Sequence, residues 1–102
     1  MGAYDFFIYS TGKTATKAFN NIKGEVTKQN FIQLNVTVRN ETEAMEVATD
    51  LLHVKQDKRV NDKYGPAGCL WICESRQYLF FGWEPEDRED LLEDDYMLLD
   101  FI

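Results

Sequence analysis

Hydrophobic residues in the first 24 positions follow two different periods in turn, which predicts a strand followed by a helix. Residues 3–10 are rich in aromatic and β-branched side chains and end at Thr11 and Gly12, as is typical of a strand closed by a turn. The next apolar residues recur every three to four positions and are Ala15, Ala18, Phe19 and Ile22. That spacing places them on one face of a helix that begins near Thr14 and ends near Gly24.

A second strand and helix are predicted by the following segment. Apolar side chains occupy the even positions of residues 31–38, which favours a strand with one buried face. These are Ile32, Leu34, Val36 and Val38. Asn40 stands three residues before Glu43, a variant of the capping box that starts many helices. The helix itself is predicted by apolar residues at helical spacing, Ala44, Val47, Ala48, Leu51 and Leu52.

Residues 55–83 predict a loop followed by a hairpin. Residues 55–63 are mostly polar and show no apolar period, and we interpret them as a mobile connection. Residues 64–68 contain two glycines and a proline, which favours a turn. Two apolar runs, 69–74 and 78–83, are separated by three polar residues, which is typical of an antiparallel hairpin.

The resulting order, β-α-β-α-β-β, predicts an α+β fold in a single domain. We expect the two helices to pack on one face of a small, mainly antiparallel sheet, and the strand order is left open. The body covers residues 1–83, and residues 84–102 form an acidic C-terminal segment, either part of the same domain or an interaction tail. Whether that segment is a helix, a strand or a disordered tail also stays open.

Composition supports one folded unit. The chain has 102 residues, of which 44% are hydrophobic and 14% aromatic, which is ample for a single core. The first residues do not resemble a signal peptide, and no run approaches the roughly 20 apolar residues that a membrane span needs. We therefore expect a soluble cytoplasmic protein that does not act at a membrane.

The charge of the chain is concentrated at its C-terminal end. Residues 84–102 hold nine carboxylates and one base, Arg88, a net charge of −8 within a total of −7. Residues 1–83 hold nine acids and ten bases, a net charge of +1. A localised negative field attracts basic partners and repels nucleic acid, so this segment indicates where binding takes place.

Nucleotide hydrolysis is disfavoured by the region around Gly12, Lys13 and Thr14. This triplet lies between a predicted strand and helix and invites comparison with the phosphate-binding loop. That motif requires a glycine where this chain has Phe7. We therefore interpret the triplet as a turn, with Thr11 or Thr14 capping the helix.

No other constellation predicts catalysis or metal binding. His53 is the only histidine, and no nucleophile-elbow sequence accompanies it. Cys69 and Cys73 lie about 13 Å apart if both are in one strand, too far for a disulfide, so we expect two reduced, buried thiols and no zinc site. Asp94 and Asp95 are interpreted as a solvated face. The expectation is a protein without cofactor, metal or enzymatic activity.

A glycine-rich loop provides an alternative site. Its two glycines, proline and tyrosine stand next to a base, and such backbone approaches a ligand closely. The residues are Lys63, Tyr64, Gly65, Pro66 and Gly68. On this interpretation the loop binds a small ligand or a protein, and the acidic segment only increases solubility.

Three short motifs carry a resemblance to a known group of proteins. Residues 10–19 (STGKTATKAF), 62–70 (DKYGPAGCL) and 78–83 (YLFFGW) resemble a family of small uncharacterised proteins from phages and bacterial mobile elements. That family shares a TGKTA-x-x-AF opening, a DK[WY]GPAG loop and an FFGW strand. The resemblance implies a phage or mobile-element setting, hence the host cytoplasm, but no reaction. This chain departs from it by lacking a glycine- and tyrosine-rich segment between Lys23 and Asn30, and by its acidic end.

Charge, size and setting together predict a phage-encoded binding protein. We expect it to inhibit a host nucleic-acid-handling or defence protein by presenting an acidic surface to a basic groove. The carboxylates expected to bind the partner are Glu86, Asp87, Glu89, Asp90, Glu93, Asp94 and Asp95. Direct binding of nucleic acid is not expected. The aromatic residues Tyr78 and Phe80 either support a homodimer through pairing at a sheet edge or pack in the core, and the sequence leaves both alternatives open.

Overall fold

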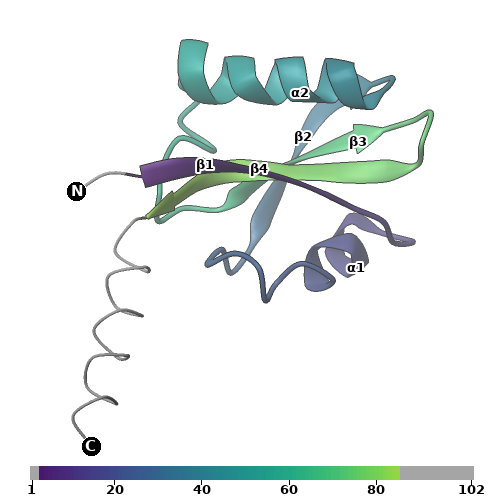
Figure 1. Cartoon of the computed structure of the whole chain (residues 1–102), viewed down its shortest axis with the longest axis horizontal. Helices are drawn as coiled ribbons and strands as arrows, with labels where there is room; N and C mark the ends of the chain where they lie inside the picture. The colour runs from purple at the N-terminus through teal and green to yellow at the C-terminus, as the bar shows by residue number, and fades with distance from the viewer. Residues whose placement is uncertain (1–2, 86–102) are drawn as a thin grey trace, which may run out of the picture.

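A four-stranded mixed sheet forms the centre of the computed structural model, which describes residues 3–85 (Figure 1). The strands are β1 (Ala3–Ser10), β2 (Phe31–Val38), β3 (Ala67–Ile72) and β4 (Gln77–Pro85). They lie in the order β1-β4-β3-β2. β4 is antiparallel to both of its neighbours, whereas β2 and β3 are parallel. The predicted α+β fold, with its element order and mainly antiparallel sheet, is confirmed.

Both predicted helices form, and each begins at a capping side chain. In α1 (Ala15–Asn20), Thr14 Oγ1 accepts a hydrogen bond from the Lys17 backbone N–H at 3.2 Å. In α2 (Glu41–Thr49), Asn40 Oδ1 accepts one from the Glu43 backbone N–H at 2.9 Å. A π-helical turn, η1 (Asp50–Val54), continues α2 toward the connection to β3. The capping pattern at Asn40 therefore predicted the start of α2 correctly.

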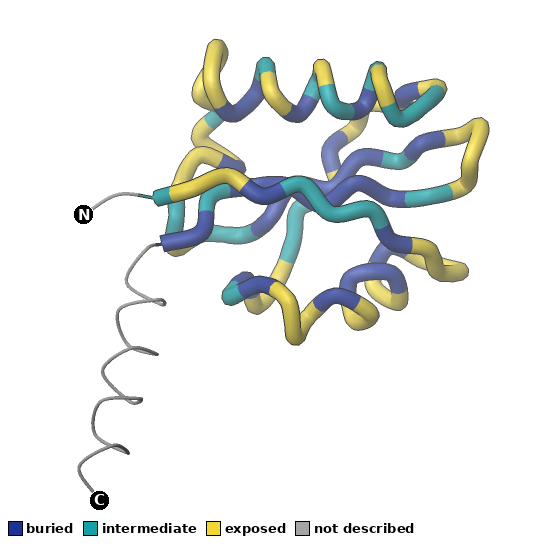
Figure 2. The backbone as a smooth tube through the Cα atoms, in the orientation of Figure 1, coloured by how far each residue is buried: buried dark blue, intermediate teal, exposed yellow. Residues whose placement is uncertain are grey.

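The two helices cover opposite faces of the sheet, and the expectation that they share one face is wrong (Figures 1 and 2). Neighbouring residues of β3 belong to different cores, because Leu70 packs with α2 and Cys69 with α1. Side chains alternate along a strand, so β3 and β4, which are apolar at nearly every position, need a cover on both sides. The α2 core contains Leu34, Val38, Ala44, Ala48, Leu51, Leu52, Val60, Leu70, Ile72, Leu79 and Phe81. The α1 core contains Phe6, Ala15, Ala18, Phe19, Ile22, Val26, Ala67, Cys69, Tyr78 and Phe80.

The cysteines differ from each other in environment. Both are free thiols, as expected, but only Cys69 is buried. Burial raises the pKa of Cys69 to about 12, so it packs as a small apolar side chain. Cys73 is exposed, which corrects the prediction of two buried thiols. The reason is that β3 ends at Ile72, so Cys73 already belongs to the turn that leads into β4.

β2 also departs from its predicted pattern at one position. Leu34 and Val38 are buried, but Val36 is 44% exposed. The register between β2 and β3 shifts between Gln33 and Thr37, which interrupts the regular alternation at Val36. The alternating sequence therefore predicted the strand but not its irregularity.

β4 is a central strand, so Tyr78 and Phe80 do not lie at an edge of the sheet. The expectation that these two residues offer an edge for pairing is wrong, because β1 and β3 flank β4 on its two sides. β4 also continues through Glu84 to Pro85, two residues of the C-terminal segment. Glu84 is 2% exposed and accepts hydrogen bonds from Thr27, from its backbone N–H at 3.0 Å and its hydroxyl at 2.9 Å.

Candidate functional site

The carboxylates expected to bind a partner lie outside the described residues. They are Glu86, Asp87, Glu89, Asp90, Glu93, Asp94 and Asp95. Their role stays a prediction. Within residues 3–85, the two candidate sites are the predicted loop at residues 63–68 and a groove beside α2.

The loop at residues 63–68 is held by a buried lysine. Lys28 is only 4% exposed, and its Nζ donates hydrogen bonds to the carbonyl oxygens of Lys63 at 2.9 Å and Asp62 at 3.3 Å. Burial lowers the pKa of Lys28, while the charges of Glu84 and Asp62 act in the opposite direction. Two of the carbonyl groups that lead into the loop are therefore already used within the chain.

The glycines of the loop are explained by packing. A Cβ built on Gly68 would lie 2.5 Å from the ζ-carbon of Phe81 and 2.9 Å from a methyl carbon of Val60. One built on Gly65 would lie 3.1 Å from the Cβ of Asp62. Tyr64, in contrast, is 68% exposed, with the Lys63 ammonium 5.3 Å from the centre of its ring. The loop therefore offers one aromatic side chain and one base to a ligand. The residues that pack closely against its glycines belong to the same chain.

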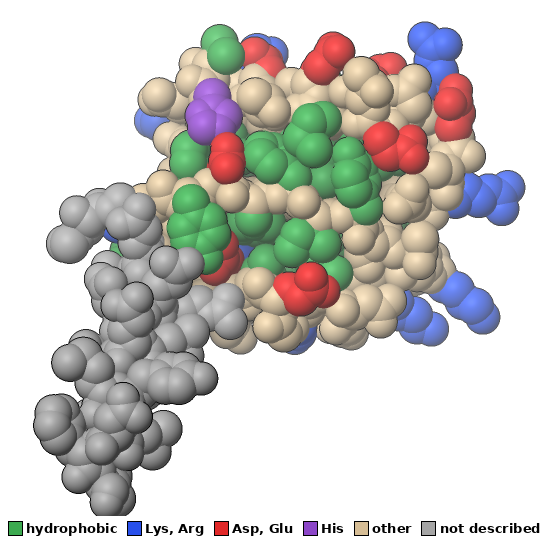
Figure 3. Space-filling model, viewed as in Figure 1, with side chains coloured by type: hydrophobic (Ala, Val, Ile, Leu, Met, Phe, Trp, Pro, Cys, Tyr) green, Lys and Arg blue, Asp and Glu red, His purple; other side chains and the backbone are tan. Residues whose placement is uncertain are grey.

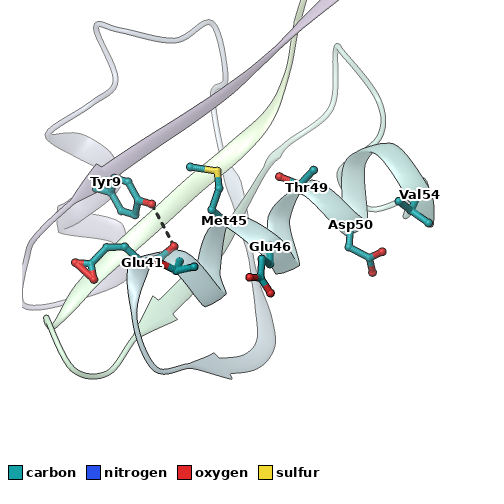
Figure 4. A pocket seen from close by; sticks show the side chains of 8 residues that line it. Tyr9, Glu41, Met45, Glu46, Thr49, Asp50 and Val54 are labelled. Atoms are coloured by element: carbon teal, nitrogen blue, oxygen red, sulfur yellow. Dashed lines mark hydrogen bonds between the residues drawn. The ribbon is translucent and has the colours of Figure 1, made fainter.

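A groove runs along the side of α2 that faces β1 (Figure 4). Its volume is about 660 Å³, and its surface is mainly apolar. Tyr9 reaches from β1 to the first turn of α2, where its hydroxyl donates a 3.4 Å hydrogen bond to the Glu41 carbonyl oxygen. We call this the β1–α2 groove and define it by Tyr9, Glu41, Thr42, Met45, Glu46, Thr49, Asp50 and Val54.

The rim of the β1–α2 groove is acidic. Three of its eight residues are Glu41, Glu46 and Asp50. Asp50 forms an exposed ion pair with Lys55 at 3.2 Å, and Glu41 accepts a 3.4 Å hydrogen bond from Gln77. Glu46 is exposed on the outer side of the helix (Figure 4). An apolar floor with a negatively charged rim suits a ligand that carries both apolar and basic groups.

A cluster of side chains around His53 lies beyond the end of the groove, on the same side of β1. His53 Nε2 lies 2.8 Å from Asp5 Oδ2, and its ring meets that of Trp83 edge-on with 5.0 Å between the centres. The Trp83 indole N–H donates to Asn61 Oδ1 at 2.8 Å. The π-helical turn η1 positions His53, and such turns occur often at functional sites. The cluster ties η1 and the loop after it to β1 and β4.

Sequence reasoning did not identify either feature. The sequence pattern disfavours His53 as a member of a catalytic triad or of a zinc site, but it does not indicate what His53 contacts. The partner of His53, Asp5, lies 48 positions away in sequence. Cys69, the buried thiol, packs on the α1 side of the sheet, on the other face. The one available signal was Asp5 itself, a charge inside an otherwise apolar strand. Within residues 3–85, no group of three metal-ligating side chains comes together.

The face of the molecule that carries β1 is largely hydrophobic. Figure 3 shows apolar side chains gathered across this face, with acidic side chains around them and most of the visible Lys and Arg side chains at the right of the view. Tyr4 is exposed there, and Phe7, Ile8 and Tyr9 are only partly buried. Among residues 3–85, no helix is long and apolar enough to cross a membrane. Exposed apolar patches of this kind often mark contact surfaces in proteins.

Comparison with known proteins adds no assignment. No family model, curated protein or solved structure matches this chain.

Proposed function

We propose that this protein is a non-enzymatic binding protein that uses its acidic C-terminal segment to occupy a basic surface on another protein. The observation that carries the proposal is the placement of charge, because residues 84–102 hold a net charge of −8 and residues 1–83 a net charge of +1. Charge concentrated in this way steers association toward basic partners. A role limited to solubility would not require this concentration.

Proteins that handle nucleic acid are the partner class that fits best. Their channels are lined with lysine and arginine side chains that contact phosphates, and an array of carboxylates can occupy the same positions. The resemblance to phage and mobile-element proteins supports a host nucleic-acid-handling or defence protein as the target, and inhibition in the host cytoplasm as the outcome. The segment's own charge disfavours direct binding to nucleic acid.

The body provides a platform that is consistent with this function. The acidic rim of the β1–α2 groove extends negative charge onto the folded part of the chain. The alternative site, the loop from Lys63 to Gly68, has less support because packing against Phe81 and Asp62 explains its glycines. A small-ligand function for that loop would rest on Lys63 and Tyr64 alone.

The test is a comparison of two full-length chains as baits in a bacterial lysate. One is the natural chain, and the other carries Gln or Asn at the seven carboxylates from Glu86 to Asp95. A control carries Gln or Asn at seven of the nine acids in residues 1–83 instead, so the change in net charge is the same. Captured proteins are identified by mass spectrometry and eluted with a gradient of salt.

The proposal expects a nucleic-acid-binding protein that the natural chain and the control capture and the neutralised chain loses. Elution at moderate salt is also expected, because the contacts are electrostatic. Equal capture by the neutralised chain would contradict the proposal. Capture of nothing by any bait would also contradict it and would direct attention to Lys63 and Tyr64.

A further inference from the structure

One long edge of the sheet is open among the described residues. β1 is the outermost strand and pairs with β4 along its entire length, from Ala3 opposite Pro85 to Ser10 opposite Tyr78. No strand within residues 3–85 pairs with its other edge. Such an edge presents a row of backbone N–H and C=O groups that an extended segment of another chain can pair with.

The opposite edge, β2, is less suited to pairing. Its register is irregular between Gln33 and Thr37, and irregularities of this kind bend a strand and disrupt pairing. Its exposed side chains are mostly polar. β1 has a continuous register over eight residues and carries mainly aromatic and aliphatic side chains. The two edges therefore differ, and β1 is the one that remains available for pairing.

The open edge of β1 is continuous with the β1–α2 groove. Side chains of a strand added beside β1 would alternate between the two faces of the sheet. Those on the α2 side would lie next to Tyr9 and the apolar floor that Met45 contributes. The same side carries the carboxylates of Asp5, Glu41, Glu46 and Asp50. Backbone pairing, apolar contact and negative charge are thus available to one extended segment.

We propose that the β1 edge and the β1–α2 groove together bind an extended, basic segment of a partner protein, which adds to the sheet as a fifth strand. Charge decides between this occupant and a second copy of the chain. A second copy paired through β1 would bring like carboxylates together, whereas alternating lysine or arginine side chains would complement them. The residues of this site lie between Ala3 and Val54 in the sequence and do not include the C-terminal carboxylates, so its test is distinct from that of the function proposed above.

The experiment uses the full ¹⁵N-labelled chain and a nine-residue peptide in which lysine and valine alternate, with a glutamate–valine peptide as its counterpart. Binding is followed by amide chemical shifts and by hydrogen exchange. The proposal expects shifts in residues 3–10 and 41–54, with slower exchange at β1 amides that face outward. The same result is expected when the seven C-terminal carboxylates are neutralised.

Matched variants separate the groove from general charge. Glu46 and Glu25 are both exposed, but Glu25 belongs to the turns after α1. Glu46→Lys should raise the dissociation constant roughly three- to tenfold, as expected for one reversed charge near an exposed contact. Glu25→Lys, with the same net charge, should leave it nearly unchanged.

Several outcomes would overturn the proposal. Absence of lysine–valine binding would do so, as would equal binding of the glutamate peptide or equal effects of the two variants. If the peptide no longer binds after the seven C-terminal carboxylates are neutralised, its binding site is the C-terminal segment and not the β1 edge. That result would overturn this proposal and leave the function proposed above unaffected. A dimer in sedimentation, with β1 protected in the absence of peptide, would show that a second copy occupies the edge.

Discussion

At the scale of single residues, Gly68 is the strand glycine of the described residues that leaves the least room for a side chain. Its backbone does not adopt a positive φ, so conformational freedom is not the reason for a glycine there. The reason is space, because the ring of Phe81 and a methyl group of Val60 fill the position where a side chain would begin. Both neighbours are fully buried, and neither has room to move away.

Gly68→Ala should therefore destabilise the protein by about 1–3 kcal/mol, the usual cost of overpacking a core. Gly24→Ala is the matched control, since a Cβ at Gly24 meets nothing within 4 Å. It should change the free energy of unfolding by about 0.5 kcal/mol or less. Chemical denaturation of both variants measures the difference. Equal stabilities would show that Phe81 and Val60 can rearrange.

A second residue-scale prediction concerns pH. Hydrogen bonds from the side chain and the backbone N–H of Arg59 lower the pKa of Asp57 from 3.8 to about 2. A carboxyl with a lowered pKa in the folded state contributes stability above its unfolded pKa, and that contribution disappears as the pH falls through the folded value. Asp57 therefore stabilises the fold above pH 3.8 and ceases to do so near pH 2.

The free energy of unfolding of Asp57→Asn should be lower than that of the natural chain near neutral pH. This difference should be small, because water screens an ion pair in which Arg59 is largely exposed. It should shrink as the pH falls from about 4 to about 2. Denaturation curves of both chains at several pH values test this. A difference that stays constant with pH would contradict the assignment.

At the scale of elements, α2 and η1 form one helical segment that both packs on the sheet and lines the groove. α2 buries Ala44 and Ala48 on the sheet, and η1 buries Leu51 and Leu52. The outer side of the same segment lines the β1–α2 groove, and its last turn carries His53 to Asp5. The position of the groove therefore depends on where this segment starts and how it is held.

The N-cap of α2 provides the element-scale prediction. Asn40→Ala removes the acceptor for the Glu43 backbone N–H and should destabilise the protein by about 1 kcal/mol. Asn40→Asp should keep nearly all of the stability, because aspartate caps helices as well as asparagine does. Thermal unfolding measures both. An alanine variant as stable as the natural chain would mean that the tertiary contacts of α2 make its cap unimportant.

At the scale of the whole molecule, the described residues form a sheet that is covered on both sides. The α2 core and the α1 core are built from residues between Phe6 and Phe81. The buried side chains of Lys28 and Glu84 form hydrogen bonds with Thr27, Asp62 and Lys63, all within the same part of the chain. The acidic residues proposed to bind a partner follow directly after β4, so a folded body precedes them in the chain.

A chain that ends at Pro85 should therefore still fold. We expect cooperative unfolding and unchanged near-ultraviolet circular dichroism, because both cores are retained. The truncated chain should no longer capture the partner that the natural chain captures, because it lacks the seven carboxylates. A truncated chain without cooperative unfolding would show that residues 86–102 are needed for the fold, and the neutralised full-length chain would then be the valid test.

Much of the fold could be predicted because local patterns report local structure. Asn40 and Glu43 predicted the start of α2, and the apolar spacing of Ala15, Ala18 and Phe19 predicted the buried face of α1. The candidate site was less accessible. The β1–α2 groove joins Tyr9 to residues more than 30 positions away, and no short-range pattern reports which strand will lie beside a helix.

The sequence by itself determined the elements, their caps, the single folded domain and the concentration of charge in residues 84–102. These depend on side-chain periodicity and on residue type, both of which are properties of neighbouring positions. Only the tertiary structure decided that the helices lie on opposite faces, that β1 is an open edge and that Asp5 meets His53. Those features follow from strand order and long-range packing, which depend on the interactions of the whole chain at once.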